Sequence, residues 1–396
     1  MRIYVTGVGV VSGIGNNTTE HLQALSSSRH GMGKVTLFPT SLDATVSEVK
    51  YTNADLKQLL GLPTNKILSR TTLLGMLAAK EALKNSGITD IHAFRTGFIS
   101  STSVGGMDLS EQAYADFKAN PNDTDVQMFA QHDCGDSTQR IAEYLGINEF
   151  VTTVSTACSS GANAVIMGVR MIKNGLLDAV IVGGVDSLCK FTLNGFNSLM
   201  ILDKEHCRPF DNSRAGLNLG EGAGYIVLQN EYSLYSDPYC LLTGYANAND
   251  AYHQTATSPE GDGPYECMRQ SIEMAGLKPK DIGYINVHGT GTPNNDLSEG
   301  KAIERLVGNK IPPFSSVKAF IGHTLDAAEG IEAVLSVLLV ANGIVYPNLN
   351  FKTPIEGTNL VPVTEYKTGL KLNHVLSNSF GFGGNDSSLL FSSINK

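Results

Sequence analysis

Basic residues are scarce in this chain relative to acidic ones. Its 29 Lys and Arg residues stand against 38 Asp and Glu residues, which gives a formal net charge of -9. A nucleic-acid-binding protein normally carries an excess of basic charge, so this class is disfavoured. An acidic partner would need a local basic patch, because the field of the whole molecule repels negative charge. We therefore expect no nucleic-acid partner.

Cysteine patterns typical of metal sites or disulfide scaffolds are missing. The six cysteines are scattered, with no CxxC pair and no metal-ligand spacing. A chain of 396 residues with 42% hydrophobic residues can bury a large core, so it needs no disulfides for stability. The sequence therefore predicts reduced thiols, no metal site and a cytoplasmic location.

Long apolar runs and nucleotide-binding loops are missing as well. No apolar segment reaches the roughly 20 residues that a membrane helix needs. The first residues, MRIYVTGVGVVS, show a glycine-punctuated strand pattern in place of the unbroken apolar segment of a signal peptide. There is no G-x-x-x-x-G-K-[ST] loop, and GVGVVSG lacks the third glycine of a dinucleotide fingerprint. We expect no membrane span, no signal peptide and no nucleotide site.

The chain does show strand-like and helix-like segments in alternation. This alternation predicts a layered α/β fold. The second part of the chain repeats the pattern of the first, which indicates a duplicated unit with a seam near residues 230–240. We predict an N-terminal half, residues 1–235, and a C-terminal half, residues 236–396. The expected strands are 3–11, 96–103, 150–157, 178–187, 239–250 and 282–289, with a hairpin over 374–391; the expected helices are 70–87, 137–146, 161–175, 265–276, 297–308 and 330–343.

One cysteine stands in an unusual setting. Cys158 lies in VSTACSSGAN, where the strand pattern of 150–157 gives way to the helix pattern of 161–175. The free N–H groups at a helix start and the helix dipole stabilise negative charge, so we expect a lowered thiol pKa. Small neighbouring residues leave space for a substrate. The pattern is typical of a nucleophile, and the alternative is a buried structural thiol.

Two histidines and a glycine-rich segment are candidate partners of this thiol. His288 ends the strand pattern of YINVHGTGTP, and His323 follows in VKAFIGH, five residues after Lys318. Sequence spacing alone brings neither histidine to Cys158, and each can equally be a core or turn residue. The segment SFGFGG, residues 379–384, offers backbone N–H groups for an oxyanion, but it also fits an ordinary hairpin turn.

Taken together, these segments resemble the β-ketoacyl-acyl carrier protein synthases of the thiolase superfamily, in particular the elongating type I/II ketosynthases. The resemblance runs almost end to end. It implies a five-layer αβαβα fold made of two similar halves, usually assembled as a homodimer. The motifs that carry it, in family order, are VTGVGVVSGIG, STACSSG, RPFDNSRAGLNLGEGAG, DAYHQTATSPEGDG, HGTGTPNNDLSEGKAI, VKAFIGH and SNSFGFGG.

The resemblance assigns roles to the polar candidates. It implies that Cys158 accepts the acyl group, and that His288 and His323 serve decarboxylation and stabilise the resulting carbanion. It implies that Lys318 orients the surroundings of His323, and that Glu332 completes the polar network. Two neutral imidazoles can donate N–H bonds to an enolate oxygen without protonating its carbon.

The resemblance also implies a substrate channel. Thr290 and Thr292 would hydrogen-bond the phosphopantetheine arm of an acyl carrier protein. The backbone N–H groups of Cys158 and Phe382 would form an oxyanion hole. Phe382 would gate the nucleophile, and Phe196 would line the acyl pocket.

The implied reaction is the decarboxylating condensation of malonyl-acyl carrier protein with an acyl thioester on the enzyme, in fatty-acid or related polyene or polyketide synthesis. It requires no metal or redox cofactor. Acyl carrier protein is the implied partner, with Lys66 and Arg70 in the docking region; a solvated helix face is the alternative for these two residues. The assembly would be a homodimer or a ketosynthase heterodimer.

Two other functions are possible for such a chain. A non-catalytic partner subunit of the chain-length-factor type would usually lack the nucleophile, so Cys158 argues against it. A thiolase would place a second catalytic cysteine near the C-terminus, and no cysteine follows Cys267.

The sequence departs from the family pattern at several positions. Where G-H-x-x-G-A-A-G is usual, this chain has GHTLDAAEG, with Asp326 and Glu329 in place of two glycines. These carboxylates either raise the proton affinity of His323 or face away from it. GFGGND replaces GFGGTN, and SRAGL replaces RDGF. Because the nucleophile and both histidines remain, we expect an active enzyme with a specialised substrate.

Overall fold

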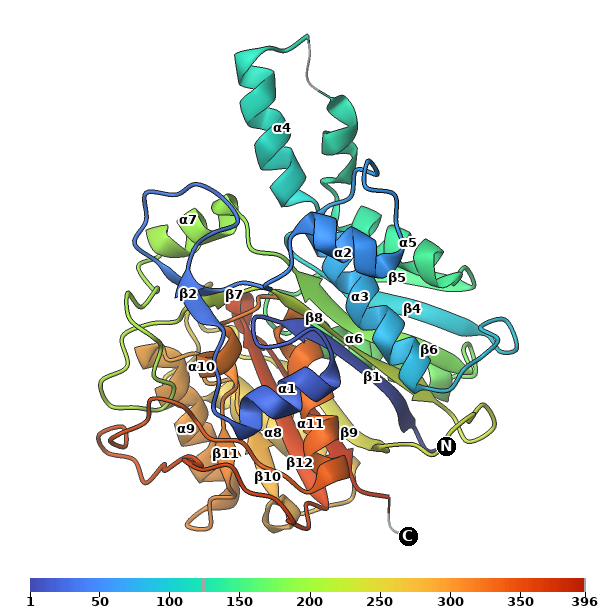
Figure 1. Ribbon diagram of the computed structural model, residues 1–396. Helices are drawn as coiled ribbons and strands as arrows, with labels where there is room; N and C mark the ends of the chain where they lie inside the picture. The colour runs from blue at the N-terminus through green and yellow to red at the C-terminus, as the bar shows by residue number, and fades with distance from the viewer. Residues whose placement is uncertain (123–124, 395–396) are drawn as a thin grey trace.

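The computed structural model describes residues 1–122 and 125–394 (Figure 1). Within these residues, ten strands form one sheet in the order β11-β10-β12-β13-β9-β1-β8-β6-β4-β5. The sheet has two halves, which join where β1 pairs with β9 through Tyr4 opposite Leu241 and Val5 opposite Cys240. The predicted alternation of strands and helices therefore yields a layered α/β fold.

The N-terminal half-sheet has the order β1-β8-β6-β4-β5. Strands β5, β4 and β6 run parallel to one another, while β8 is antiparallel to both β6 and β1. Along the chain the elements are β1 (Tyr4–Ser12), α3 (Arg70–Asn85), β4 (Thr96–Ser101), α5 (Cys134–Leu145), β5 (Phe150–Val154), α6 (Ser160–Lys173), β6 (Ala179–Asp186) and β8 (Gly222–Gln229).

The C-terminal half-sheet repeats this topology strand by strand. Its order is β9-β13-β12-β10-β11; β11, β10 and β12 are parallel, and β13 is antiparallel to β12 and β9. The elements are β9 (Cys240–Asn249), α8 (Asp262–Met274), β10 (Tyr284–Asn286), α9 (Pro293–Val307), β11 (Phe314–Ser315), α10 (Lys318–Ile321), α11 (Ala327–Asn342), β12 (His374–Gly381) and β13 (Asn385–Ser392).

The helices complete five layers. Helices α3 and α5 pack against strands of the N-terminal half-sheet, and α8 packs against strands of the C-terminal half-sheet beside α9. Helices α6 and α11 contact each other and strands of both half-sheets, so they form the central layer. The molecule thus has the predicted αβαβα architecture. The boundary predicted at residue 235 falls between β8 and β9; whether the halves are separate domains stays a prediction.

The central layer is tightly packed and strongly apolar. Residues 327–340 of α11 are all buried. Where α6 and α11 meet, a side-chain carbon added at Gly161 would lie 2.6 Å from the backbone nitrogen of Gly330. This close approach requires glycine at the start of α6, and it fixes the segment after Cys158 against α11.

Several elements were not predicted from the sequence. Besides β8, β11 and α10, whose bounds are given above, they include α1 (Thr18–Ser26), a small sheet of β2 (Met32–Lys34), β3 (Thr45–Ser47) and β7 (Leu219–Gly220), α2 (Asn53–Leu60), α4 (Met107–Ala119), the 3-10 turn Val126–Gln131, and α7 (Lys190–Ser198). Helix α4 and this 3-10 turn extend away from the layers at the top of Figure 1. In the part of the chain that is described, helices that combine the length and the hydropathy needed to span a membrane are absent.

Candidate active site

Cys158 lies in a sharp turn between β5 and α6. The preceding Ala157 has a positive φ of 55°, which is strained for a residue with a side chain. The hydroxyl of Ser160 stabilises the turn, because it donates to the carbonyl of Ala157 and accepts from the backbone N–H of Thr156, each at 2.6 Å. Ser379 on β12 donates to the carbonyl of Cys158 at 2.8 Å. The turn therefore attaches the cysteine to the C-terminal half.

His288 follows β10, and its backbone is held by a buried carboxylate. Glu299 on α9 accepts the N–H groups of His288 and Gly289, each at 2.9 Å. The side-chain amide of Asn378 also donates to Glu299, at 3.1 Å. Glu299 was not identified as a site residue from the sequence, although it lies within the quoted motif HGTGTPNNDLSEGKAI.

His323 lies between α10 and α11. Its backbone N–H donates to the carbonyl of Asn218 at 2.7 Å, and its Nδ1 accepts the backbone N–H of Leu325 at 3.0 Å. A neutral imidazole carries a single proton, so this contact assigns the proton of His323 to Nε2. That N–H group is free to point into the site.

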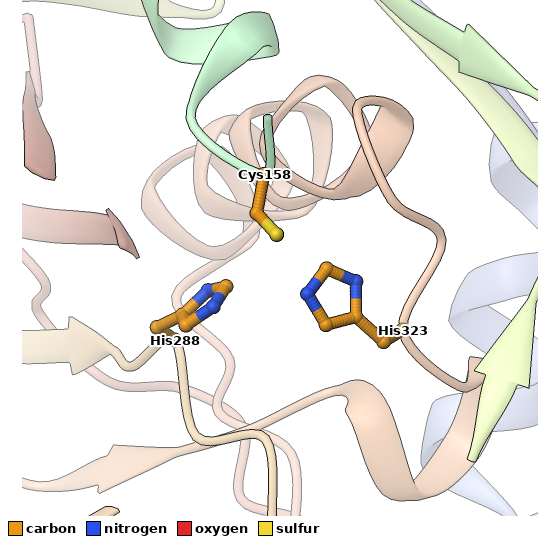
Figure 2. A group of neighbouring side chains, drawn as sticks. All are labelled: Cys158, His288 and His323. Atoms are coloured by element: carbon orange, nitrogen blue, oxygen red, sulfur yellow. The ribbon is translucent and has the colours of Figure 1, made fainter. Parts of the chain in front are cut away.

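The turn in one half and two loops of the other bring the three side chains together. Figure 2 shows the sulfur of Cys158 directed toward the rings of His288 and His323. The sulfur and one nitrogen of each ring all lie within 4.8 Å of one another. The rings are 5.3 Å apart and nearly perpendicular, at 86°. All three residues are buried. The convergence that sequence spacing could not supply is thus present.

Lys318 binds His288, and its charge also acts on His323; the expectation that it orients the surroundings of His323 stays a prediction. Its Nζ donates to the carbonyl of His288 at 2.6 Å and to Glu332 at 2.6 Å, and it lies 3.3 Å from Nδ1 of His288. An ammonium group only donates, so Nδ1 accepts and the proton of His288 lies on Nε2. Helix α10 thus holds Lys318 within hydrogen-bond distance of His288, which follows β10.

Both histidines are neutral at physiological pH. Burial lowers the pKa of His288 well below its usual value, and the positive charge of Lys318 and the neighbouring His323 add to this effect. Burial and Lys318 likewise hold the pKa of His323 well below its usual value. The site therefore presents two uncharged rings, each with its proton on Nε2.

The thiol differs from the sequence expectation. Burial raises the pKa of Cys158 to about 12, and the charge of Asp326 contributes in the same direction. Lys318 and the N–H groups of Phe382 and Cys158, which hydrogen-bond with the sulfur, lower it less than burial raises it. The expected lowered pKa is wrong, because α6 begins only at Ser160 and desolvation outweighs the helix terminus. The resting group is a neutral thiol.

The remaining substrate residues line the same cavity, which has a volume of about 230 Å³. Its walls include Thr290, Thr292, Phe196 and Phe382, together with Cys158 and both histidines. The hydroxyls of the two threonines lie 2.9 Å apart. The rings of Phe196 and Phe382 stack with centroids 6.0 Å apart. The backbone N–H groups of Cys158 and Phe382 meet at the sulfur, where the oxyanion hole was predicted.

Lys66 and Arg70 have different surroundings. Lys66 is exposed. Arg70 is only 3% exposed, and its guanidinium binds Glu221 at 2.6–3.0 Å. Neither carrier docking nor a solvated helix face is therefore correct for Arg70, because the first turn of α3 points into the protein.

The two unusual carboxyl groups do not act on His323. Asp326 is buried, and its backbone N–H donates to Asp186 at 3.0 Å. Glu329 is buried and interacts with Glu332, on the side of α11 that faces Lys318. Neither is among the groups that shift the pKa of His323, so the possibility that they raise its proton affinity is not supported.

Comparisons with known proteins agree with this geometry. Residues 1–233 match the family described as Beta-ketoacyl synthase, N-terminal domain, and residues 239–352 match Beta-ketoacyl synthase, C-terminal domain. The chain is 32% identical to 3-oxoacyl-[acyl-carrier-protein] synthase 2 of Synechocystis sp., over 98% of this chain and 97% of the relative. It is 31% identical to the enzyme of the same name from Staphylococcus aureus, over 98% of both chains.

Solved structures agree as well. A chain of the ishigamide ketosynthase/chain length factor has a TM-score of 0.92 and 28% identity, covering 100% of this chain and 99% of that one. A ketosynthase from Xenorhabdus doucetiae, solved in complex with its chain length factor, has a TM-score of 0.86 and 31% identity, covering 99% and 98%. This chain therefore belongs to the β-ketoacyl synthase family.

Proposed function

We propose that the protein is a 3-oxoacyl-acyl carrier protein synthase, which elongates an acyl chain by two carbons through decarboxylating condensation. One observation carries the proposal: a buried thiol faces two neutral imidazoles that each present an Nε2 proton. The curated relatives named above are enzymes of this type.

The first step transfers the acyl group to Cys158. The sulfur attacks the carbonyl carbon of an acyl thioester, and the bond from that carbon to the phosphopantetheine sulfur breaks. The N–H groups of Cys158 and Phe382 are placed to bind the oxyanion that forms. The proton leaves the cysteine sulfur and ends on the departing phosphopantetheine sulfur, so the step needs no permanent thiolate.

The second step removes CO2 from the malonyl thioester. The bond to the carboxylate breaks, and its electron pair forms an enolate on the thioester. Two Nε2–H donors, from His288 and His323, stabilise the enolate oxygen; each such donor is worth about 3 kcal/mol of barrier. Since both rings are neutral, neither is an acid strong enough to quench the carbanion.

The third step forms the new carbon–carbon bond. The enolate carbon attacks the acyl-Cys158 carbonyl, and the cysteine sulfur leaves as a thiolate. The product is a 3-oxoacyl thioester on the carrier, and one proton from solvent restores the thiol. This sequence uses the protein's own side chains and requires no resident metal or redox cofactor.

Acyl carrier protein is the proposed partner. The channel beside Thr290 and Thr292 suits a phosphopantetheine arm, and the exposed Lys66 offers a positive charge to an acidic carrier. A second subunit, identical or homologous, is proposed at β5. This edge strand is half-exposed along its whole length, whereas its neighbour β4 is fully buried. We also propose the halves 1–235 and 236–396 as its two domains, and a cytoplasmic location.

A chain-length-factor role is the second candidate. It is favoured by similarity to chains from ketosynthase/chain length factor complexes. The retained Cys158 and its two histidines disfavour it, because a subunit that only shapes a pocket needs no nucleophile.

Covalent labelling separates the two candidates. The protein is incubated with cerulenin or with an acyl-acyl carrier protein, digested, and mapped by mass spectrometry. We expect the label on Cys158, and formation of a 3-oxoacyl product when malonyl-acyl carrier protein is added. Labels spread over several cysteines, with no preference for Cys158, would refute the enzyme assignment.

A further inference from the structure

Helix α11 carries two buried glutamates that face one cation. Glu329 and Glu332 are three residues apart, so they lie on the same side of the helix (α11, orange in Figure 1). Their residues are 0% and 1% exposed. One oxygen of Glu332 accepts from Lys318. Within the described residues, the other oxygen of Glu332 and both oxygens of Glu329 have no hydrogen-bond partner of normal geometry.

The charges around Glu329 are few. Lys318 on α10 is the cation, and it also holds His288. Ser377 on β12 is a neutral hydroxyl near Glu329. Tyr346 stays protonated, because burial raises its pKa and the negative charge of Glu332 raises it further. Glu299 lies on the other side of His288 and is bound by backbone N–H groups.

Among the residues that the structure describes, the other neighbours of this part of α11 bring no compensating positive charge. The backbone of Gly161 on α6 lies against Glu329 and Gly330, and Gly184 and Gly224 lie against Gly330. Asp326, at the start of the helix, interacts with Asp186 instead. Lys318 can neutralise only one of the two glutamates. An unpaired buried carboxylate is therefore avoided when one glutamate is ionised and the other is protonated.

The proton belongs to Glu329. Burial raises the pKa of both carboxyl groups, but Lys318 opposes this effect at Glu332 by a hydrogen bond of 2.6 Å, whereas the charge of Glu332 adds to it and raises the pKa of Glu329 well above its usual value. Two carboxyl groups in contact cannot both ionise easily, so they titrate as a pair. A glutamic acid at position 329 can then donate a hydrogen bond to Glu332, after a small side-chain rotation.

We propose that Glu329 is a positioning residue for decarboxylation: it shares one proton with Glu332 and so keeps Lys318 bound to His288. This inference rests on the proposed function. When the pair loses its proton at alkaline pH, a second carboxylate competes for Lys318 and adds negative charge close to the forming enolate. The hydrogen bond from Lys318 to Nδ1 of His288 then weakens, so the ring is held less firmly and CO2 release slows.

The test is the pH profile of CO2 release from malonyl-acyl carrier protein. It is measured in protein carrying Cys158→Gln, so that thiol titration cannot contribute. We expect the rate to fall on the alkaline side. Adding Glu329→Gln, which cannot ionise but still donates a hydrogen bond, should remove this fall, with a gain of about tenfold per pH unit beyond the midpoint.

Two further variants keep the test decisive. Glu329→Leu is neutral but cannot donate, so it should lower the rate at every pH without an alkaline fall; it also serves if the Gln variant does not fold. Ser336→Ala, one turn beyond Glu332 on the same buried helix, should retain the parent profile.

The outcomes are distinct. An alkaline fall of the same midpoint in the parent and in Glu329→Gln, or a flat parent profile, would overturn the role of Glu329. Absence of CO2 release at every pH in the parent protein would instead count against the proposed function itself.

Discussion

Cys158 and His323 occupy equivalent places in the two halves. Each lies between the edge strand of its half-sheet and the central-layer helix that follows: β5 and α6 for Cys158, β11 and α11 for His323. In the N-terminal half a short strained turn connects strand and helix. In the C-terminal half the connection also contains α10, which carries Lys318. The same topological position therefore carries a buried thiol in one half and a neutral imidazole in the other. Under the proposed function these groups are the nucleophile and a hydrogen-bond donor.

The difference shows how a duplicated fold divides its chemistry. The N-terminal turn is stabilised by serine hydroxyls and leaves the sulfur buried, and this burial raises the pKa of the thiol. The C-terminal connection brings a cation close to the rings, which also keeps them neutral. Burial shifts the pKa of the reactive groups in both halves. Only the C-terminal connection adds a charged side chain, Lys318, that lowers the pKa of the two histidines further.

The strongest test of this division is the loss of the thiol. Cys158→Gln should abolish condensation, by at least about a thousandfold, because no acyl-enzyme can form. CO2 release from malonyl-acyl carrier protein should persist, since the histidines are intact. Product analysis by mass spectrometry checks both. If the variant still elongated acyl chains, the N-terminal turn would not supply the nucleophile.

Loss of the C-terminal donor should have the next largest effect. His323→Ala removes one Nε2–H group, so CO2 release should fall by about 100- to 1000-fold. Acylation of Cys158 should be less affected. His374→Ala, on the partly exposed start of β12, is the matched control. Unchanged CO2 release in His323→Ala would remove His323 from the mechanism.

A third prediction concerns the buried ion pair between Arg70 and Glu221, which the structure shows at the residue that was expected to dock a carrier protein. Arg70→Ala leaves Glu221 charged and unpaired, so the free energy of unfolding should fall by about 3–5 kcal/mol. Lys66→Ala, at an exposed position, should leave stability unchanged. Denaturant titration measures both. Equal stability of the two variants would show that the Arg70–Glu221 pair contributes nothing.

The smallest predicted effect concerns Asp326. This residue lies in the C-terminal connection, but its charge acts on the thiol of Cys158 in the N-terminal half. Burial is the main reason for the raised pKa of Cys158, and the charge of Asp326 is the second. Burial and the charge of Asp186 raise the pKa of Asp326 itself well above its usual value, so its charge acts on the thiol at alkaline pH. In that range Asp326→Asn should lower the thiol pKa and speed alkylation by iodoacetamide a few-fold. Asp133→Asn is the exposed control. Slower alkylation in Asp326→Asn would contradict the sign of this interaction.

Local patterns were enough for many of the regular elements in the five layers. The alternation of strands and helices, the duplicated order and the closing hairpin of β12 and β13 follow from periodicity and glycine positions, which are local properties of the chain. Elements such as α4 and α7 were missed because several of their large apolar residues, among them Tyr114, Phe117 and Phe191, are exposed and do not mark a buried face. The motifs around Cys158, His288 and His323 also predicted these residues as the reacting groups, and the structure brings their side chains together. Their roles in the reaction stay a prediction.

The sequence by itself therefore determined the layered fold and the candidate reactive side chains. Only the tertiary structure decided their charge states and partners. The thiol has a raised pKa, Lys318 binds His288, Arg70 is buried, and Glu329 faces Glu332. The physical reason is that desolvation and hydrogen bonding depend on groups brought together from distant parts of the chain, and no local pattern records those neighbours.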